Sequence, residues 1–250
     1  MRKLIFITIV CTFLAAPALA DWYGGRIYYY RINGYYSGNG GEFTLRSDGA
    51  PGLLLSNSAY DAKTRGKDGN TESFQTFCVE TAEYVAQPMD IVVSTTFVNE
   101  ATGKITGPGS HAILGSKPFG DNLDPRTAYL YTKFAQGTLA GYNYTAGAGR
   151  VASAGALQNA IWCIEGEGGA NNAFVALAND ALTVGGTTDE WVNKGIGDVR
   201  ILNSWVIDHV GDETAAYKLQ DQFYLVPVPG AVLLGILGLS LAGWKLRKFA

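Results

Sequence analysis

The chain has 250 residues, a formal net charge of −3 and only 16% charged residues. Its Lys and Arg residues are scattered and form no basic stripe, which argues against nucleic acid as a partner. Glycine (32 residues) and tyrosine (14 residues) are abundant, a composition typical of extracellular β-rich proteins with polar, adaptable loops.

Residues 1–20 have the pattern of a secretory signal peptide. The basic start Arg2-Lys3 precedes an apolar stretch too short to span a bilayer, and Ala18-Leu19-Ala20 fits a small-x-small cleavage site. We therefore expect an exported protein whose mature chain begins at Asp21. Two cysteines remain after removal of the signal, Cys78 and Cys163.

The first half of the mature chain is rich in strand-forming residues. The aromatic segment Trp22–Tyr36 contains a turn signal at Asn33-Gly34, and the segments that follow alternate in side-chain character. A polar stretch at 56–71 predicts a loop. Strands are predicted at residues 22–36, 42–46, 74–80 and 91–99.

Helical signals begin at Asp124. This residue suits an N-cap and Pro125 suits the first helical position, with apolar residues following at helical spacing. A second helix is predicted over Val151–Glu165, where a run of glycines begins at Gly166 and ends it. A third helix is predicted at 172–182, and closing strands at 199–207 and 217–226.

Strands on both sides of a helical segment predict an α+β domain over residues 21–226. We expect a β-rich sandwich or barrel-like fold with a two- to three-helix insert at about residues 124–182.

The C-terminal residues 227–250 form a separate segment. Pro227 and Pro229 break regular structure, and the uncharged run 230–244 precedes Lys245, Arg247 and Lys248. This order predicts a single membrane helix, short for a bilayer span, with the body of the protein on the non-cytoplasmic side.

The same segment resembles the PEP-CTERM sorting signal, in a variant with Val-Pro-x-Pro at residues 226–229. The resemblance implies an exosortase-type membrane enzyme as a partner. It also implies transfer from the membrane to the cell surface or the extracellular matrix. A plain C-terminal membrane tail is the alternative interpretation.

Gln158 lies on the apolar stripe of the second predicted helix. At about 100° per residue it shares a face with Ala154, Leu157 and Ile161, whereas Cys163 lies about 140° away around the axis. A buried amide needs hydrogen-bond partners. One interpretation is therefore a structural glutamine bonded to the backbone.

Two cysteines in an exported chain predict a Cys78–Cys163 disulfide. The helical phase argues against that pairing. If Gln158 faces the strand that carries Cys78, then Cys163 points elsewhere. Both alternatives stay open at this stage.

The sequences TFCVE and LQNAIW resemble the paired signatures of the internal thioester domains of bacterial surface adhesins. Here the signatures are Phe77-Cys78-Val79 and Gln158-Asn159-Ala160-Ile161-Trp162. The chain departs from the pattern at Leu157, where Thr is common, and in its extra thiol, Cys163. The resemblance implies a Cys78–Gln158 thioester with a dry wall that includes Phe77, Val79, Ile161 and Trp162.

The function implied by that resemblance is covalent adhesion. An amine on a partner surface, such as a protein lysine, would attack the thioester and become attached to Gln158. Thr76 and Tyr129 are candidates for a hydrogen bond to the Gln158 carbonyl, and the sequence assigns neither of them.

We expect a single-use tether without a cofactor or metal rather than an enzyme, because no HExxH, GxSxG or phosphate-loop motif occurs. The alternative is a non-covalent binding or matrix-structural protein with a Cys78–Cys163 disulfide.

Overall fold

The structure is a computed structural model. It describes residues 21–38, 40–47, 59–66, 73–113, 117–182, 195–212 and 214–227. The predicted signal peptide, Pro229 and the predicted membrane helix at 230–244 lie outside these residues. Among the residues described, no helix combines the length and the apolar character needed to cross a bilayer.

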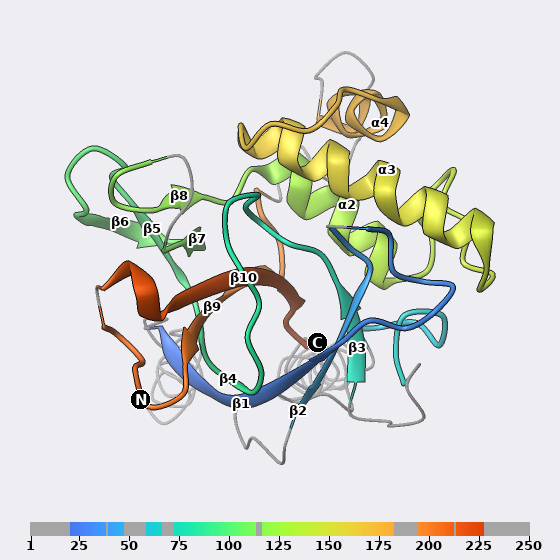
Figure 1. The fold of residues 1–250 in the computed structure, drawn as a ribbon. Coiled ribbons are helices and arrows are strands. Elements are labelled where there is room, and N and C mark those ends of the chain that lie inside the picture. Colours follow the sequence, from blue (N-terminus) through green and yellow to red (C-terminus); the bar gives the residue numbers. More distant parts are fainter. Residues whose placement is uncertain are drawn as a thin grey trace, which may run out of the picture.

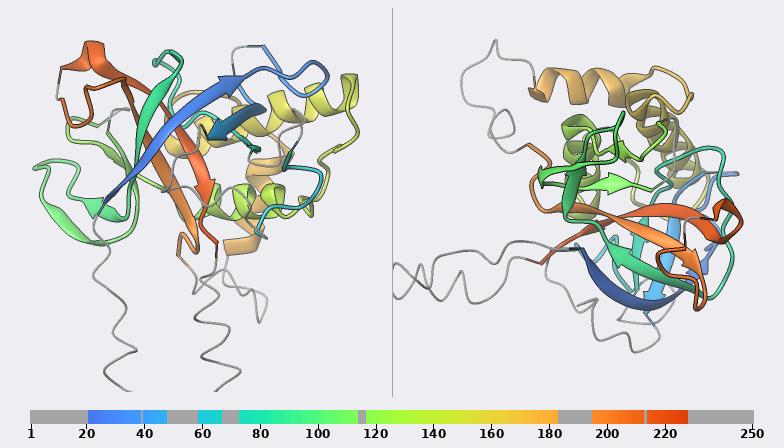
Figure 2. Two further views of the ribbon diagram at one scale, coloured as in Figure 1. Left: turned by 90° about the horizontal axis from the view of Figure 1, so that it is seen from below. Right: turned by 90° about the vertical axis from the view of Figure 1, so that its left-hand side faces the viewer.

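The body of the fold is a six-stranded antiparallel sheet with the strand order β10-β9-β4-β1-β2-β3. The sheet curls into a half-barrel, as the views in Figures 1 and 2 show. Its strands are β1 (Trp22–Tyr30), β2 (Phe43–Ser47), β3 (Ser73–Thr76), β4 (Met89–Val93), β9 (Val199–Val206) and β10 (Lys218–Leu225).

Curling brings the two edge strands, β3 and β10, together. The Thr76 hydroxyl donates to the Phe223 carbonyl oxygen at 2.8 Å, and the Phe223 N–H donates to the same hydroxyl at 3.0 Å. Just beyond β3, Cys78 forms an isolated antiparallel bridge with Gln222 of β10. The side chain of Thr76 thus substitutes for a main-chain ladder at this junction.

Three helices lie together on one side of the curled sheet (Figure 1). They are α2 (Pro125–Ala135), α3 (Ala148–Glu165) and α4 (Ala173–Leu182). The N-cap prediction is confirmed, because the Asp124 side chain accepts from the Arg126 N–H at 2.7 Å. Gly166 ends α3 in the left-handed conformation, at φ 79°. The fold is therefore α+β with a β-rich half-barrel.

The sequence prediction merged or missed several strands. The predicted strand 91–99 is divided into β4 and β5 (Thr96–Val98), because the Ser94 N–H pairs with Ile201 and the Thr95 N–H donates to the Asp21 carboxylate. The predicted strand 22–36 ends at Tyr30, before the predicted turn. The short strands β6 (Ile105–Pro108), β7 (His111–Ala112) and β8 (Asp121–Asn122) were not predicted.

Aromatic side chains fill the space between the helices and the β3–β10 junction. Tyr131 of α2 is fully buried, and its hydroxyl lies 3.1 Å from the carbonyl oxygens of both Gln75 and Phe223. Phe134 of α2 packs edge-on against Phe77, with ring centroids 4.9 Å apart. This packing holds α2 over the place where the two sheet edges meet, next to Cys78.

Glu165, the last residue of α3, reaches the N-terminus of α2. Both of its carboxylate oxygens lie 3.4 Å from the Asp124 main-chain nitrogen. Burial raises the pKa of Glu165 to about 8, from an ordinary value of 4.5. The folded protein therefore keeps this carboxyl protonated over a pH range in which the unfolded chain ionises it.

Replacing Glu165 with glutamine is expected to flatten the pH dependence of stability. As pH rises from about 4.5 to 8, the unfolded wild-type chain loses a proton that the folded state retains, so its free energy of unfolding falls. The variant has no such proton, so it should be more stable than wild type at pH 8 but not at pH 4. Urea unfolding at both pH values checks this. Asp180→Asn, an exposed change on α4, should follow wild type.

Candidate functional site

Cys78 lies on the segment that leaves β3 and joins the edge of β10. Its neighbour Val79 donates its N–H to the Asp221 carbonyl oxygen at 3.1 Å. The Cys78 side chain is only 2% exposed. The sequence predicts a strand over residues 74–80 that includes Cys78, but β3 ends at Thr76. A single bridge from Cys78 to Gln222 continues the pairing.

Gln158 occupies the middle of α3 and faces the sheet. It is 1% exposed and shares the buried face with Arg150, Ala154, Leu157 and Ile161. The predicted apolar stripe is therefore confirmed.

The carboxamide of Gln158 makes two hydrogen bonds to the main chain of Cys78. The Cys78 N–H donates to Gln158 Oε1 at 3.0 Å, and Gln158 Nε2 donates to the Cys78 carbonyl oxygen at 2.8 Å. The structure thus brings together the two residues that the sequence motifs single out, 80 positions apart in the chain. Both contacts are to backbone atoms of Cys78, which is the arrangement predicted by the interpretation of Gln158 as a structural glutamine bonded to the backbone.

The donor to the Gln158 carbonyl differs from the one expected. Thr76 donates across the sheet edge to Phe223, and both hydrogen-bond partners of the Gln158 carboxamide lie on Cys78. Neither Thr76 nor Tyr129 therefore serves this carbonyl in the part of the chain that the structure describes. The reason is geometric: Cys78 sits just past the end of β3, so its N–H is free of the β2 ladder.

The Cys78 sulfur is held in a buried, weakly polar environment. Gln222 Nε2 approaches Sγ at 3.7 Å. Burial raises the pKa of the thiol to about 12, although hydrogen bonds from Gln222 and from the Gly41 main chain act in the opposite direction. The group is therefore a neutral thiol near pH 7.

The predicted wall residues are buried or half-buried. Phe77, Val79 and Ile161 are at most 3% exposed. Trp162 is half-buried, and its indole Nε1 donates to the Glu80 carbonyl oxygen at 3.1 Å. Phe77 and Val79 flank Cys78 along the chain, and Ile161 and Trp162 lie on α3, the helix that carries Gln158.

Two consecutive glycines close the site on a third side. A Cβ on Gly40 would lie 2.4 Å from Gln158 Cγ and 2.5 Å from Trp162 Cη2. A Cβ on Gly41 would lie 2.0 Å from the Phe77 ring. Only a residue without a side chain fits this close to the pair.

Cys78 and Cys163 are both free thiols in the structure. Cys78 is buried, whereas Cys163 is partly exposed on α3. The structure therefore contains no Cys78–Cys163 disulfide, in agreement with the helical phase.

A pocket of about 370 Å³ opens beside Cys78. Its walls come from β1, from the segment after Cys78 and from β10, and include Arg31, Glu83, Tyr84 and Gln220. Cys78 is one of the residues that line this pocket.

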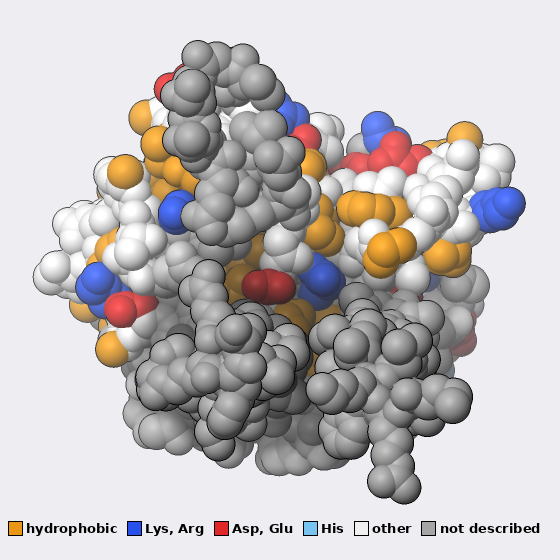
Figure 3. Space-filling model, turned by 180° about the vertical axis from the view of Figure 1, so that it is seen from behind, with side chains coloured by type: hydrophobic (Ala, Val, Ile, Leu, Met, Phe, Trp, Pro, Cys, Tyr) orange, Lys and Arg blue, Asp and Glu red, His pale blue; other side chains and the backbone are white. Residues whose placement is uncertain are grey.

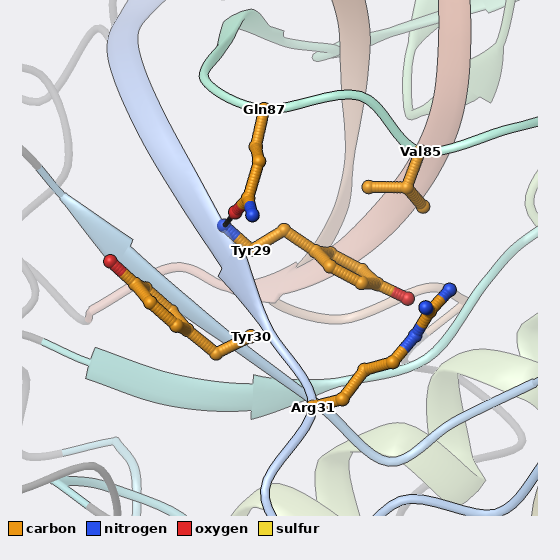
Figure 4. A pocket seen from close by; sticks show the side chains of 5 residues that line it. All are labelled: Tyr29, Tyr30, Arg31, Val85 and Gln87. Carbon is orange, nitrogen blue, oxygen red and sulfur yellow. Dashed lines mark hydrogen bonds between the residues drawn. The ribbon is translucent and has the colours of Figure 1, made fainter.

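A second pocket of about 310 Å³ adjoins the first, sharing Tyr29, Arg31 and Val85 with it (Figure 4). Gln87 Oε1 accepts from the Tyr29 N–H at 3.3 Å, and the Tyr29 ring points toward Arg31 and Val85. The two pockets therefore lie side by side at the end of β1, and Cys78 lines the first of them.

Several residues of the site were not predicted from the sequence. Gln222, Gly40 and Gly41 contact the pair, and a buried ion pair between Glu42 and Arg150 holds the glycine segment against α3. A usable signal was the run Gln220-Asp221-Gln222, three polar residues inside a predicted strand, all of them buried.

Comparison of the chain with family models, with curated proteins and with solved structures finds no match. The face seen from behind in Figure 3 shows basic and acidic side chains interspersed, without a large patch of one sign among the described residues. The assignment of a function therefore rests on the sequence motifs and the geometry of the site.

Proposed function

We propose that this is an exported cell-surface protein that carries an internal Cys78–Gln158 thioester and uses it for covalent attachment to an amine-bearing partner. The observation that carries the proposal is the docking of the Gln158 carboxamide on the main chain of Cys78, in a buried site. The protein acts once per molecule and is not an enzyme.

The hydrogen bonds between the two residues support ring formation by acyl transfer. The Cys78 sulfur attacks the Gln158 side-chain carbonyl carbon, a C–S bond forms, the C–N bond breaks, and ammonia leaves with the thiol proton. The Cys78 N–H already donates to the carbonyl oxygen on which negative charge develops. Such a preorganised donor contributes about 3–4 kcal/mol to acyl transfer, and a favourable approach of the two groups about 7–11 kcal/mol.

The environment of the sulfur favours a long-lived ring. The raised pKa of the Cys78 thiol makes its thiolate a poor leaving group toward water and amines alike, so the preference for an amine depends on the exclusion of water. The wall of Phe77, Val79, Ile161 and Trp162 restricts solvent around the bond. A thioester protected in this way can persist until an amine arrives.

Attachment uses the pocket that opens beside Cys78. An unprotonated amine enters this pocket, attacks the acyl carbon and displaces the Cys78 sulfur, which takes up a proton. The products are an amide between Gln158 and the partner, and a free Cys78 thiol. Protein lysines and similar surface amines are the reactive class that this chemistry selects.

The sequence patterns at the two ends support the proposed location. The signal pattern at residues 1–20 would direct export. The segment 227–250 would anchor the chain through residues 230–244 until an exosortase-type enzyme releases it to the surface or the extracellular matrix. The alternative is a non-covalent module held by a Cys78–Cys163 disulfide. Both cysteines are free thiols, so the structure does not contain that bond.

Incubation of the purified protein with a biotin-linked primary amine tests the proposal. We expect one biotin per chain, attached to the peptide that contains Gln158, and one newly alkylatable thiol at Cys78. Cys78→Ala should remain unlabelled, while Cys163→Ala should label like wild type. A wild-type protein that is not labelled, or a label that maps to the Gln222 peptide, would contradict the Cys78–Gln158 assignment.

A further inference from the structure

Three carboxyl groups lie together beside the pocket, apart from the Cys78–Gln158 pair. Glu80 and Glu83 belong to the segment after Cys78, and Asp221 belongs to β10. One oxygen of each lies within 4.8 Å of one oxygen of the other two. Two oxygens bound to one Ca²⁺ at about 2.4 Å can be at most about 4.8 Å apart, so the three groups are close enough to share an ion.

N–H groups hold these carboxylates in place. Asp221 Oδ1 accepts from the Ser204 N–H at 2.9 Å, and Asp221 Oδ2 accepts from the Ile113 N–H at 3.0 Å. Glu80 Oε2 lies 3.3 Å from its donor, the side-chain amide of Gln220. Glu83 Oε2 accepts from the main-chain N–H of Asp221, also at 3.3 Å. These hydrogen bonds position each group and leave coordination capacity on the oxygen lone pairs that they do not use.

The other oxygens of both glutamates receive no hydrogen bond from an N–H or hydroxyl group. Glu80 is 1% exposed, and neither its Oε1 nor Oε1 of Glu83 has such a donor. The two side chains hydrogen-bond each other, which requires a proton between them when no cation is bound. Within the described ranges, no Lys, Arg or His nitrogen lies within 4.0 Å of the three carboxylates, and Lys218 acts on Glu83 and Asp221 from farther away. Burying carboxylate charge without compensation is costly, and a bound cation would remove that cost.

We propose that Glu80, Glu83 and Asp221 bind one Ca²⁺. An all-oxygen, carboxylate-rich ligand set suits a hard cation, and Ca²⁺ accepts irregular geometry and completes its shell with water, whereas Mg²⁺ demands a near-ideal octahedron. The ion ties the segment after Cys78 to β10. Because Glu83 also lines the pocket beside Cys78, Ca²⁺ fixes that pocket wall. This proposal does not depend on the thioester.

Thermal unfolding of the purified protein in EDTA and then in CaCl₂ tests the site. We expect affinity on the order of 10⁻⁴–10⁻³ M, so 10 mM CaCl₂ should raise Tm by about 3–10 °C. Calorimetric titration should show one Ca²⁺ per chain. A wild-type Tm that is the same in EDTA and in CaCl₂ would show that the carboxyl cluster is held by shared protons, and would overturn the proposal.

Four variants locate the effect. Glu83→Gln and Asp221→Asn should lose the CaCl₂-dependent shift, whereas Asp180→Asn should keep it because Asp180 is exposed on α4, outside the cluster. The shift should also persist in Cys78→Ala, which separates this site from the thioester. Equal shifts in Glu83→Gln and wild type would place the ion elsewhere.

Discussion

Replacing Arg150 with methionine is expected to lower the free energy of unfolding by about 3–5 kcal/mol, because it removes the cation that is paired with the buried Glu42 carboxylate. Arg150 is 1% exposed, and Glu42 is fully buried. Arg150 Nε donates to Glu42 Oε2 at 2.8 Å, and the guanidinium lies 3.9 Å from the Tyr35 ring centroid. Urea unfolding at pH 7 measures the loss, and Tm should fall by about 6–20 °C.

Two controls separate the loss of the ion pair from the loss of packing. Removing both charges in Glu42→Met with Arg150→Met should cost less than Arg150→Met alone, because no uncompensated charge remains. Arg126→Met breaks a half-exposed pair with Asp124 and should cost only about 0.2–1 kcal/mol. An Arg150→Met protein as stable as Arg126→Met would show that the buried pair does not hold this part of the fold together.

The Arg150–Glu42 pair also bears on the reactive site. Glu42 directly follows Gly40-Gly41, and Arg150 lies on the same face of α3 as Gln158. The pair therefore fixes the glycine segment against the helix that carries the carboxamide. Under conditions in which both variants are folded, a smaller fraction of Arg150→Met than of Arg126→Met should contain the thioester.

Replacing Gly40 with alanine is expected to prevent ring formation in most molecules. The added Cβ would lie 2.4 Å from Gln158 Cγ and 2.5 Å from Trp162, so the glutamine or the loop must move. A displacement of about 1 Å can slow a positioned reaction about 100-fold, and overpacking should cost about 1–3 kcal/mol of stability. The fraction of protein lacking one ammonia, measured by intact mass, reports the result.

Gly38→Ala is the matched control in the same loop. Gly38 has φ +53° but no atom lies within 4 Å of the position of a Cβ, so the substitution strains the backbone without pushing on Gln158. This variant should be destabilised yet still form the ring. A full ammonia deficit in Gly40→Ala would mean that the tight contact at Gly40 is irrelevant to the chemistry.

Local signals predicted much of the helical part of the fold. Single residues with strong backbone preferences mark the start of α2 at Asp124-Pro125 and the end of α3 at Gly166. Both predictions are confirmed. The inward orientation of Gln158 followed from helical periodicity alone. These features depend on residues only a few positions apart.

The rest depends on contacts between distant segments. No residue close to Thr76 in the sequence indicates that β3 ends there. The end of β3 is set by the approach of β10, whose Phe223 main chain hydrogen-bonds the Thr76 side chain. Arg150 and Glu42 lie 108 positions apart, and neither is flanked by a motif. Gln222 reaches the Cys78 sulfur only because the sheet curls.

The intact mass of the purified, non-reduced protein is the sharpest test of the Cys78–Gln158 thioester. We predict a chain lighter than its sequence by one molecule of ammonia, a deficit that disappears in Cys78→Ala and in Gln158→Ala but persists in Gln222→Ala. A wild-type mass equal to the full sequence, or lower by two hydrogens only, would mean that sulfur and carboxamide never join, and would contradict the proposed thioester.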